Sequence, residues 1–263
     1  MKLEVLEKKA SIKTKDEPLV FVHGAAGGAW YFTSFLDYFS KRGYDCYALS
    51  LRGHGKSDGY DNLDSFGLDD YVVDVKQVID KLDKKPILIG HSMGGAIAQR
   101  YLSHYQDDLS AVVLLASAEA GGISEDSHLG LFFSDARSFL RKARAHHPDE
   151  KITLEKLMNQ TIFSNRFSDS ELKEIRNKLT KESTKVKKDL LKPYMTGFET
   201  IKIPVYVIGS LGDHIVTPDK IEHTAKAFGV KPIFMNDCCH FMTIDPDWEK
   251  AADVIYQCLN NHR

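Results

Sequence analysis

Short apolar runs separated by helical patterns are the feature that most constrains the fold of this chain. The runs are residues 18–22, 45–51, 86–89, 109–116, 204–208 and 232–235. Between them apolar residues recur at helical spacing, as at Val72, Val75 and Val78. Buried strands that alternate with helices are typical of a parallel sheet covered on both faces. We therefore expect an α/β fold with a mostly parallel central sheet flanked by helices, and an antiparallel edge strand within residues 2–13.

Residues 119–198 interrupt this alternation. Their apolar spacing predicts helices over 129–145, 153–158, 170–182 and 186–191, and it predicts no strand. The interpretation is a helical cap inserted into one domain, whose core is formed by residues 1–118 and 199–263. A chain of 263 residues is long enough to bury the core of such a domain.

The most informative motif is G-x-S-x-G at residues 90–94, with an apolar strand before it and a helical pattern after it. In this context the glycines permit a very tight turn that lifts the Ser92 hydroxyl clear of the sheet. The hydroxyl then lies at the amino end of a helix, where backbone N–H groups favour developing negative charge. The motif predicts that Ser92 is a nucleophile.

A serine nucleophile needs a base, and the base needs an acid that orients it. Asp213 and His240 each follow a predicted strand, so both are expected at the carboxyl edge of the sheet, where sites in open parallel sheets are built. The alternatives for the acid are Glu119, Asp219 and Asp237, of which the last two fit a strand end less well.

The chain resembles the α/β-hydrolase family over essentially its whole length. The matching segments are His-Gly-Ala-Ala-Gly-Gly at 23–28, Arg-Gly-His-Gly-Lys-Ser at 52–57 and Gly-His-Ser-Met-Gly-Gly at 90–95, followed in order by Asp213 and His240. The insertion stands where this family places its cap. Serine at the nucleophile position argues against the haloalkane dehalogenases and soluble epoxide hydrolases of this fold, which use aspartate.

The resemblance implies a role for each residue of the site. Ser92 would attack, His240 would accept its proton, and Asp213 would orient and stabilise the imidazolium. The backbone N–H groups of Ala25 and Met93 would form the oxyanion hole. No cofactor and no metal would be needed.

Other polar residues near these motifs are expected to be structural. His23 is expected to shape the loop that carries Ala25. His54 and His91 are expected to support the site, and Cys238 and Cys239 to pack beside His240.

The expected substrate is a small or medium apolar carboxylic ester, cleaved through an acyl-enzyme. Candidate substrate-binding residues are Trp30 and Tyr31 after the Ala25 loop, and Phe132 and Phe133 in the cap. Two alternatives stay open: the same triad could cleave an activated carbon–carbon bond, a thioester or an amide, or the chain could be a small-molecule receptor that retains the triad.

Composition excludes several other classes. The formal net charge is -2, without the basic surplus of a nucleic-acid-binding protein. No apolar run approaches the ~20 residues of an integral membrane segment, and the histidines and cysteines show no metal-ligand spacing. Because the first residues have no secretory pattern, a cytoplasmic location is expected. Nothing in the sequence specifies an oligomeric state.

Overall fold

The computed structural model of the chain describes residues 1–124 and 161–261. Its centre is a seven-stranded sheet with the order β1-β3-β2-β4-β5-β6-β7. The strands are β1 (Val5–Lys8), β2 (Leu19–Val22), β3 (Cys46–Leu49), β4 (Ile87–His91), β5 (Ala111–Leu115), β6 (Val205–Ser210) and β7 (Pro232–Met235). β1 pairs antiparallel with β3, and all other neighbours are parallel. The expected sheet and its antiparallel edge strand are thus confirmed.

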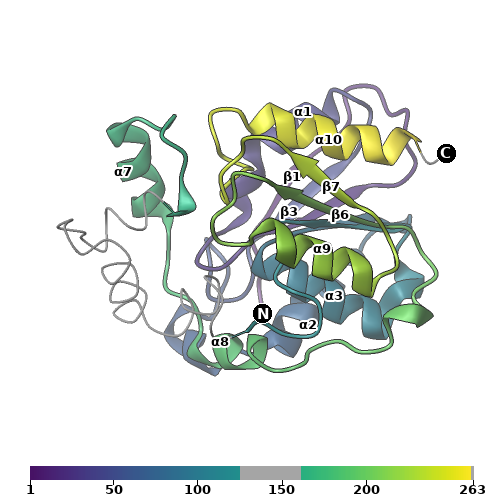
Figure 1. Ribbon diagram of the computed structural model, residues 1–263, viewed down its shortest axis with the longest axis horizontal. Helices are drawn as coiled ribbons and strands as arrows, with labels where there is room; N and C mark the ends of the chain where they lie inside the picture. The colour runs from purple at the N-terminus through teal and green to yellow at the C-terminus, as the bar shows by residue number, and fades with distance from the viewer. Residues whose placement is uncertain (125–160, 262–263) are drawn as a thin grey trace.

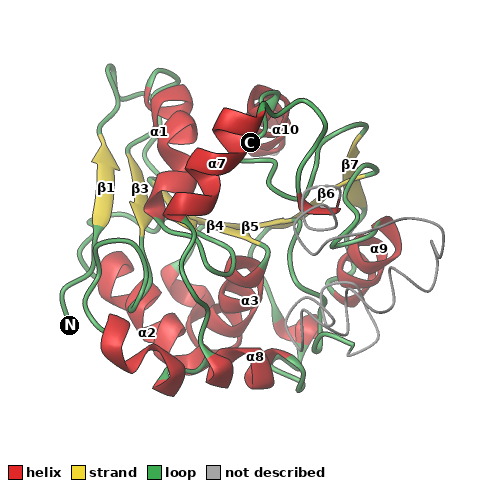
Figure 2. Ribbon diagram, turned by 90° about the vertical axis from the view of Figure 1, so that its left-hand side faces the viewer, coloured by secondary structure: helices red, strands yellow, loops and turns green. Residues whose placement is uncertain are grey.

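Helices cover both faces of this sheet. The described α-helices are α1 (Thr33–Ser40), α2 (Leu68–Ile79), α3 (Met93–Tyr105), α7 (Asp169–Lys178), α8 (Thr184–Leu190), α9 (Pro218–Ala227) and α10 (Trp248–Asn261). Short 3-10 turns are η1 (Ala29–Phe32), η2 (Tyr60–Ser65), η3 (Gln106–Asp108) and η4 (Phe198–Thr200). In Figure 1, α1 and α10 lie above the sheet, and α2, α3 and α9 lie below it. Figure 2 shows α2 and α3 on the side of the sheet opposite α1 and α10.

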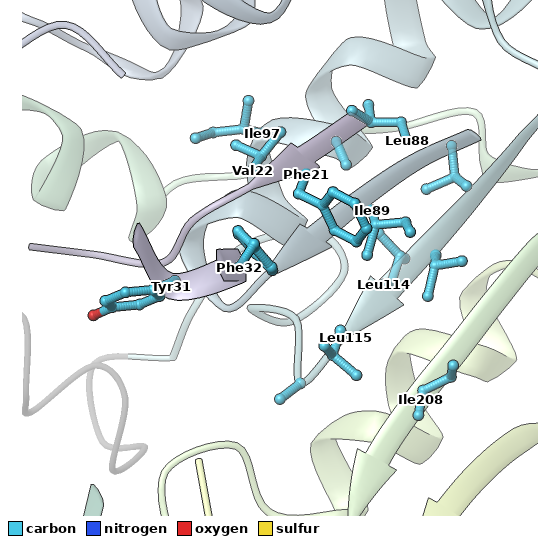
Figure 3. Close-up of a cluster of buried hydrophobic side chains, with 14 of the residues drawn as sticks. Phe21, Val22, Tyr31, Phe32, Leu88, Ile89, Ile97, Leu114, Leu115 and Ile208 are labelled. Carbon is cyan, nitrogen blue, oxygen red and sulfur yellow. The ribbon is translucent and has the colours of Figure 1, made fainter. Parts of the chain in front are cut away.

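The hydrophobic core explains why the middle strands read as unbroken apolar runs. Every residue of β2, β4 and β5 is buried, because both faces of these strands are covered by helices. Figure 3 shows apolar side chains from the central strands and η1, with Phe21 of β2 beside Phe32 of η1 at a ring-centroid distance of 5.0 Å. Because these central strands are packed on both faces, the loops at their carboxyl ends start from a rigid part of the molecule.

The order of the strands reverses at one point of the sheet, between β2 and β4. After β2 the chain moves to β3 on one side, whereas after β4 it moves to β5 on the other side. The loops that follow β2 and β4 therefore diverge from adjacent strands, and ligand sites in open α/β sheets form at such a reversal. The loop after β2 contains Ala25, and the turn after β4 contains Ser92.

The described parts of 119–198 contain helices and no strand. α7 lies to the left of the sheet in Figure 1, and α8 packs against α2 and η2. The helix predicted for 170–182 is too long: α7 ends at Lys178, and Leu179 is already extended with φ -69° and ψ 138°. Helical spacing continues past this point, but residues 179–183 instead bind the core. The helices predicted over 129–145 and 153–158 lie outside the described residues.

Candidate active site

The turn after β4 holds Ser92 in a conformation that few side chains adopt. Ser92 has φ 54° and ψ -117°. The turn needs glycines because a Cβ on Gly90 would lie 2.3 Å from the Gly94 carbonyl oxygen, and a Cβ on Gly94 would lie 2.3 Å from the Val22 carbonyl oxygen. Strain of this kind persists only where the surrounding structure holds it. The result is a serine at the start of α3 with its hydroxyl at the carboxyl edge of the sheet.

Ser92, His240 and Asp213 form a continuous hydrogen-bonded series. The Ser92 hydroxyl lies 3.0 Å from His240 Nε2, and His240 Nδ1 lies 2.8 Å from Asp213 Oδ2. All three side chains are buried. Since the carboxylate only accepts, Nδ1 carries the proton and Nε2 is free to accept one from the serine. The arrangement can generate an alkoxide nucleophile at neutral pH.

Asp213 is positioned by the turn that follows β6. Its Oδ1 accepts the N–H groups of Ile215 at 2.8 Å and Val216 at 3.0 Å, which leaves Oδ2 directed at the imidazole. Two backbone donors on one oxygen fix the plane of the carboxylate.

The three alternative acids lie elsewhere. Glu119 pairs with Lys220 at 3.2 Å, and Asp237 pairs with Arg166 at 2.9 Å. Asp219 lies on α9 with its side chain 69% exposed. Of the four carboxylates that the sequence offered, the structure brings Asp213 to His240.

The His91 side chain binds the backbone of His240. His91 Nε2 donates to the His240 carbonyl oxygen at 2.8 Å, and the two rings lie 5.0 Å apart. Burial and the neighbouring His240 lower the pKa of His91 to about 3, so it stays neutral. Cys238 and Cys239 are buried free thiols, and burial raises the pKa of Cys238 to about 11.

Two backbone N–H groups are available beside the serine. Among the described residues, neither the N–H of Ala25 nor that of Met93 has a hydrogen-bond acceptor. Gly24 brings the first of these loops close, since a Cβ there would lie 3.0 Å from Ser92 Cβ. Unpaired donors on adjacent strand ends are what an oxyanion hole requires.

Backbone strain gathers at this edge of the sheet. Of the described non-glycine residues, Ala26, Ser92 and Ala116 have positive φ values, of 60°, 54° and 41°. They lie in the turns that follow β2, β4 and β5. Residues held in such conformations cluster at functional sites, and the strain here marks the turns around Ser92.

His23 and His54 support the loop that carries Ala25. His23 Nε2 accepts the Leu51 N–H at 3.0 Å, while Nδ1 donates to the Gly24 carbonyl oxygen at 2.7 Å. Burial, followed by the charge on His54, lowers the pKa of His23 to about 3. A neutral His23 with this tautomer is a structural group.

The candidate substrate-binding residues are placed differently from one another. Trp30 is half-buried, with Lys178 over its ring. Tyr31 is buried, and its ring contacts that of Phe241 at 5.3 Å. Among the described residues, the Tyr31 hydroxyl has no hydrogen-bond partner. The other two candidates, Phe132 and Phe133, lie outside the described residues.

A pocket lies beside the acid and the base. Its lining includes Gly212 and Cys239, which directly precede Asp213 and His240, and the rings of Phe163 and Phe167. Phe163, Phe167 and Leu172 form an apolar wall of the pocket, and polar residues, among them Asn165, Arg166 and Asp237, also line it. The apolar wall is joined to the core because Phe163 packs against Phe241 at 4.9 Å.

Sequence reasoning missed a second group of residues at the site. Thr180 and Glu182 both bind Ala26, which is 154 and 156 residues away along the chain. In the sequence, only His54 in the motif at residues 52–57 pointed toward this group, and the motif does not specify which residue His54 binds.

Residues 17–247 match the model of a family described as alpha/beta hydrolase fold. The chain belongs to the alpha/beta hydrolase fold family. Among solved structures, this alpha/beta hydrolase is similar to a monoacylglycerol lipase of Paleococcus ferrophilus, with a TM-score of 0.75, 22% identity and 100% of each chain covered. It is also similar to the esterase EaEST of Exiguobacterium antarcticum, with a TM-score of 0.78, 18% identity, and 97% and 94% of the two chains covered. At these identities the likeness concerns the fold.

Curated relatives match a shorter part of this alpha/beta hydrolase. The AB hydrolase superfamily protein YisY of Bacillus subtilis (strain 168) is 37% identical over 107 residues, which are 38% of this chain and 38% of the relative. The chain spans less than half the length of the first curated relatives that it matches, at 38%, 39% and 43%.

The described residues lack two further features. None of their helices has the length and apolar character needed to cross a membrane. Within the same residues, no group of three or more histidine, cysteine or acidic side chains is arranged to hold a metal ion.

Proposed function

We propose that this chain is a serine hydrolase that cleaves a carboxylic ester of a small or medium apolar substrate. The single observation that carries the proposal is the hydrogen-bonded series from Ser92 through His240 to Asp213. Two backbone N–H groups beside the serine that have no acceptor among residues 1–124 and 161–261 support it, because ester hydrolysis passes through an oxyanion.

The proposed reaction has two halves. Ser92 Oγ attacks the ester carbonyl carbon while its proton passes to His240 Nε2, and the oxyanion is held by the N–H groups of Ala25 and Met93. Collapse expels the alcohol, which takes the proton from His240 and leaves an acyl-enzyme. Water then attacks the acyl carbon, with its proton accepted by His240, and the acid leaves as Ser92 recovers its proton. Asp213 stabilises the imidazolium in both halves.

The apolar substrate is supported by the pocket beside the triad. Phe163 and Phe167 offer an apolar surface for an acyl or alkyl group on one side of the pocket, while Asn165, Arg166 and Asp237 make other parts of its lining polar. We propose that the Tyr31 hydroxyl, which has no partner among the described residues, contacts substrate, and that Trp30 lines the entrance. Residues 119–198, with Phe132 and Phe133, are proposed as the cap.

Steady-state hydrolysis of p-nitrophenyl esters of increasing acyl length tests this function, with Ser92→Ala measured in parallel. We expect turnover in the wild type and a loss of at least ~10³-fold in the variant, because the nucleophile is removed. The acyl length that is hydrolysed with the highest kcat/KM indicates the size of the acyl group that the pocket accommodates.

Other outcomes identify the alternatives. Turnover that survives Ser92→Ala contradicts the proposal. Ser92-dependent cleavage of thioesters, amides or activated ketones without ester cleavage favours the related hydrolase reactions. A ligand-induced rise in melting temperature without turnover favours a receptor.

A further inference from the structure

Glu182 is a buried carboxylate whose hydrogen-bonding capacity is fully used. Its Oε2 accepts the Ala26 N–H at 3.0 Å and lies 3.1 Å from His54 Nε2. Its Oε1 accepts the Tyr71 hydroxyl at 2.9 Å and the Ser183 N–H at 2.8 Å. A carboxylate offers about four lone-pair positions, so these donors fix Glu182 in one place.

His54 is the charged partner of this carboxylate. Its Nε2 faces Glu182 and its Nδ1 faces the Arg52 carbonyl oxygen at 3.1 Å, so both nitrogens face acceptors and both carry protons. Burial lowers the pKa of His54, but the charge and hydrogen bond of Glu182 outweigh burial and raise it. Burial likewise raises the pKa of Glu182, and His54 outweighs this and lowers it. Both shifts favour the ionised pair.

The Ala26 peptide is held by residues 180–182 at both of its polar atoms. While its N–H donates to Glu182, its carbonyl oxygen accepts the Thr180 N–H at 2.9 Å and the Thr180 hydroxyl at 3.3 Å. Ala26 has φ 60°, in the left-handed region that alanine adopts only at a cost. The contacts with Thr180 and Glu182 hold Ala26 in this conformation.

We propose that Glu182 is a positioning residue for catalysis, which holds the Ala26 peptide in its left-handed conformation and so aims the neighbouring N–H of Ala25 at the oxyanion. This inference rests on the proposed serine hydrolase function. Glu182 acts through Ala26 and does not touch the substrate. Oxyanion donors are effective only when they are in place before the charge develops, so the reaction depends on this contact.

The test compares Glu182→Gln with the wild type in p-nitrophenyl ester hydrolysis, with active sites counted by the acylation burst. In either orientation the new amide NH2 faces a backbone N–H, of Ala26 or of Ser183. We expect kcat to fall by about 10- to 100-fold, because small misplacements of catalytic groups cost this much, while KM changes less than about twofold. Glu182→Asp, which keeps the charge but is one methylene shorter, is the second variant if the first does not fold.

A rescue distinguishes positioning from general stability. Glycine adopts left-handed φ without the cost that alanine has. Adding Ala26→Gly to the Glu182 variant should therefore recover about 3- to 10-fold in kcat. The matched control is Asp45→Asn, which removes another carboxylate that accepts a backbone N–H, that of Ala10, at the edge of the sheet formed by β1 and β3, and should leave kcat unchanged.

The outcomes separate the two proposals. A folded Glu182 variant with wild-type kcat overturns this inference, as does a fall in kcat that Ala26→Gly does not reverse. Absence of Ser92-dependent turnover in the wild type overturns the proposed function and this inference with it.

Discussion

At the scale of single residues, the site depends on two carboxylates, Asp213 and Glu182, whose oxygens all accept hydrogen bonds. Asp213 divides its two oxygens between the backbone of its own turn and His240. Glu182 divides its oxygens in the same way, between Ala26 with His54 and Tyr71 with Ser183. In both cases a carboxylate holds its target because the carboxylate itself is held.

This division of labour predicts the effect of Asp213→Asn. Asparagine can keep the backbone contacts through its oxygen, but its NH2 group then faces His240 Nδ1 and favours the wrong imidazole tautomer. We expect kcat for esters to fall by about 10³- to 10⁴-fold with little change in melting temperature. Steady-state kinetics and thermal unfolding of the purified variant measure both.

Asp219→Asn is the control, because Asp219 is exposed on α9 and follows the same strand. It should retain wild-type kcat. Equal losses in the two variants would show that the assignment of the acid is wrong.

At the scale of helices and strands, the sequence predicted most elements because pattern and burial agree there. β2, β4 and β5 are buried on both faces, so their sequence is continuously apolar and easy to recognise. Because Ser92, Asp213 and His240 each follow a predicted strand, they were expected at one edge of the sheet. The structure brings these three side chains together.

The missed features depend on contacts between distant segments. Nothing in the Lys181-Glu182-Ser183 stretch distinguishes Glu182 from a solvated charge, and its main partner is 156 residues away. The end of α7 at Lys178 has the same cause, since residues 179–183 leave the helix to bind Ala26 and Phe66. The spacing of apolar residues in the sequence does not indicate contacts with such distant segments.

The start of α8 carries a prediction at this scale. The Ser183 hydroxyl accepts the N–H groups of Lys185 and Val186 and donates to the Phe66 carbonyl oxygen at 2.6 Å. Ser183→Ala therefore removes a helix cap and a tie to the core, and should lower the free energy of unfolding by about 2 kcal/mol. Urea denaturation measures the difference.

Ser168→Ala provides the comparison. Ser168 caps α7 in a capping box with Glu171, but it is exposed, and the hydrogen bonds of its side chain stay within residues 168–171. Its loss should cost about 1 kcal/mol or less. Equal costs for the two serines would contradict the proposed tie between Ser183 and Phe66.

At the scale of the whole molecule, the pair of His54 and Glu182 makes stability depend on pH. The folded pKa of His54 is raised above 6.5, so its contribution is complete below that value and is lost as pH rises through the folded pKa. The folded pKa of Glu182 is lowered below 4.5, so its contribution is complete above that value and is lost in acid. Together they stabilise most between these two values.

Wild type and His54→Asn should therefore differ in a pH-dependent way. The advantage of the wild type in unfolding free energy should be constant up to about pH 6.5 and then shrink by about 1.4 kcal/mol per unit until the folded pKa is passed. Glu182 and Asp74 favour the charged form of His54 throughout this range. Urea unfolding between pH 5 and pH 9 measures it, and an advantage that grows with pH would contradict an ionised pair.

The long separation between β5 and β6 has a consequence for how the protein is made. Val112 pairs with Val205, so the sheet cannot be completed until the ribosome has passed the long stretch of chain between these two residues. Ser92 emerges early, with its turn and α3, whereas Asp213 emerges only after β6 and His240 only after β7. A nascent chain thus carries a serine without its base, and the proposed hydrolase becomes active only after β6 and β7 have joined the sheet.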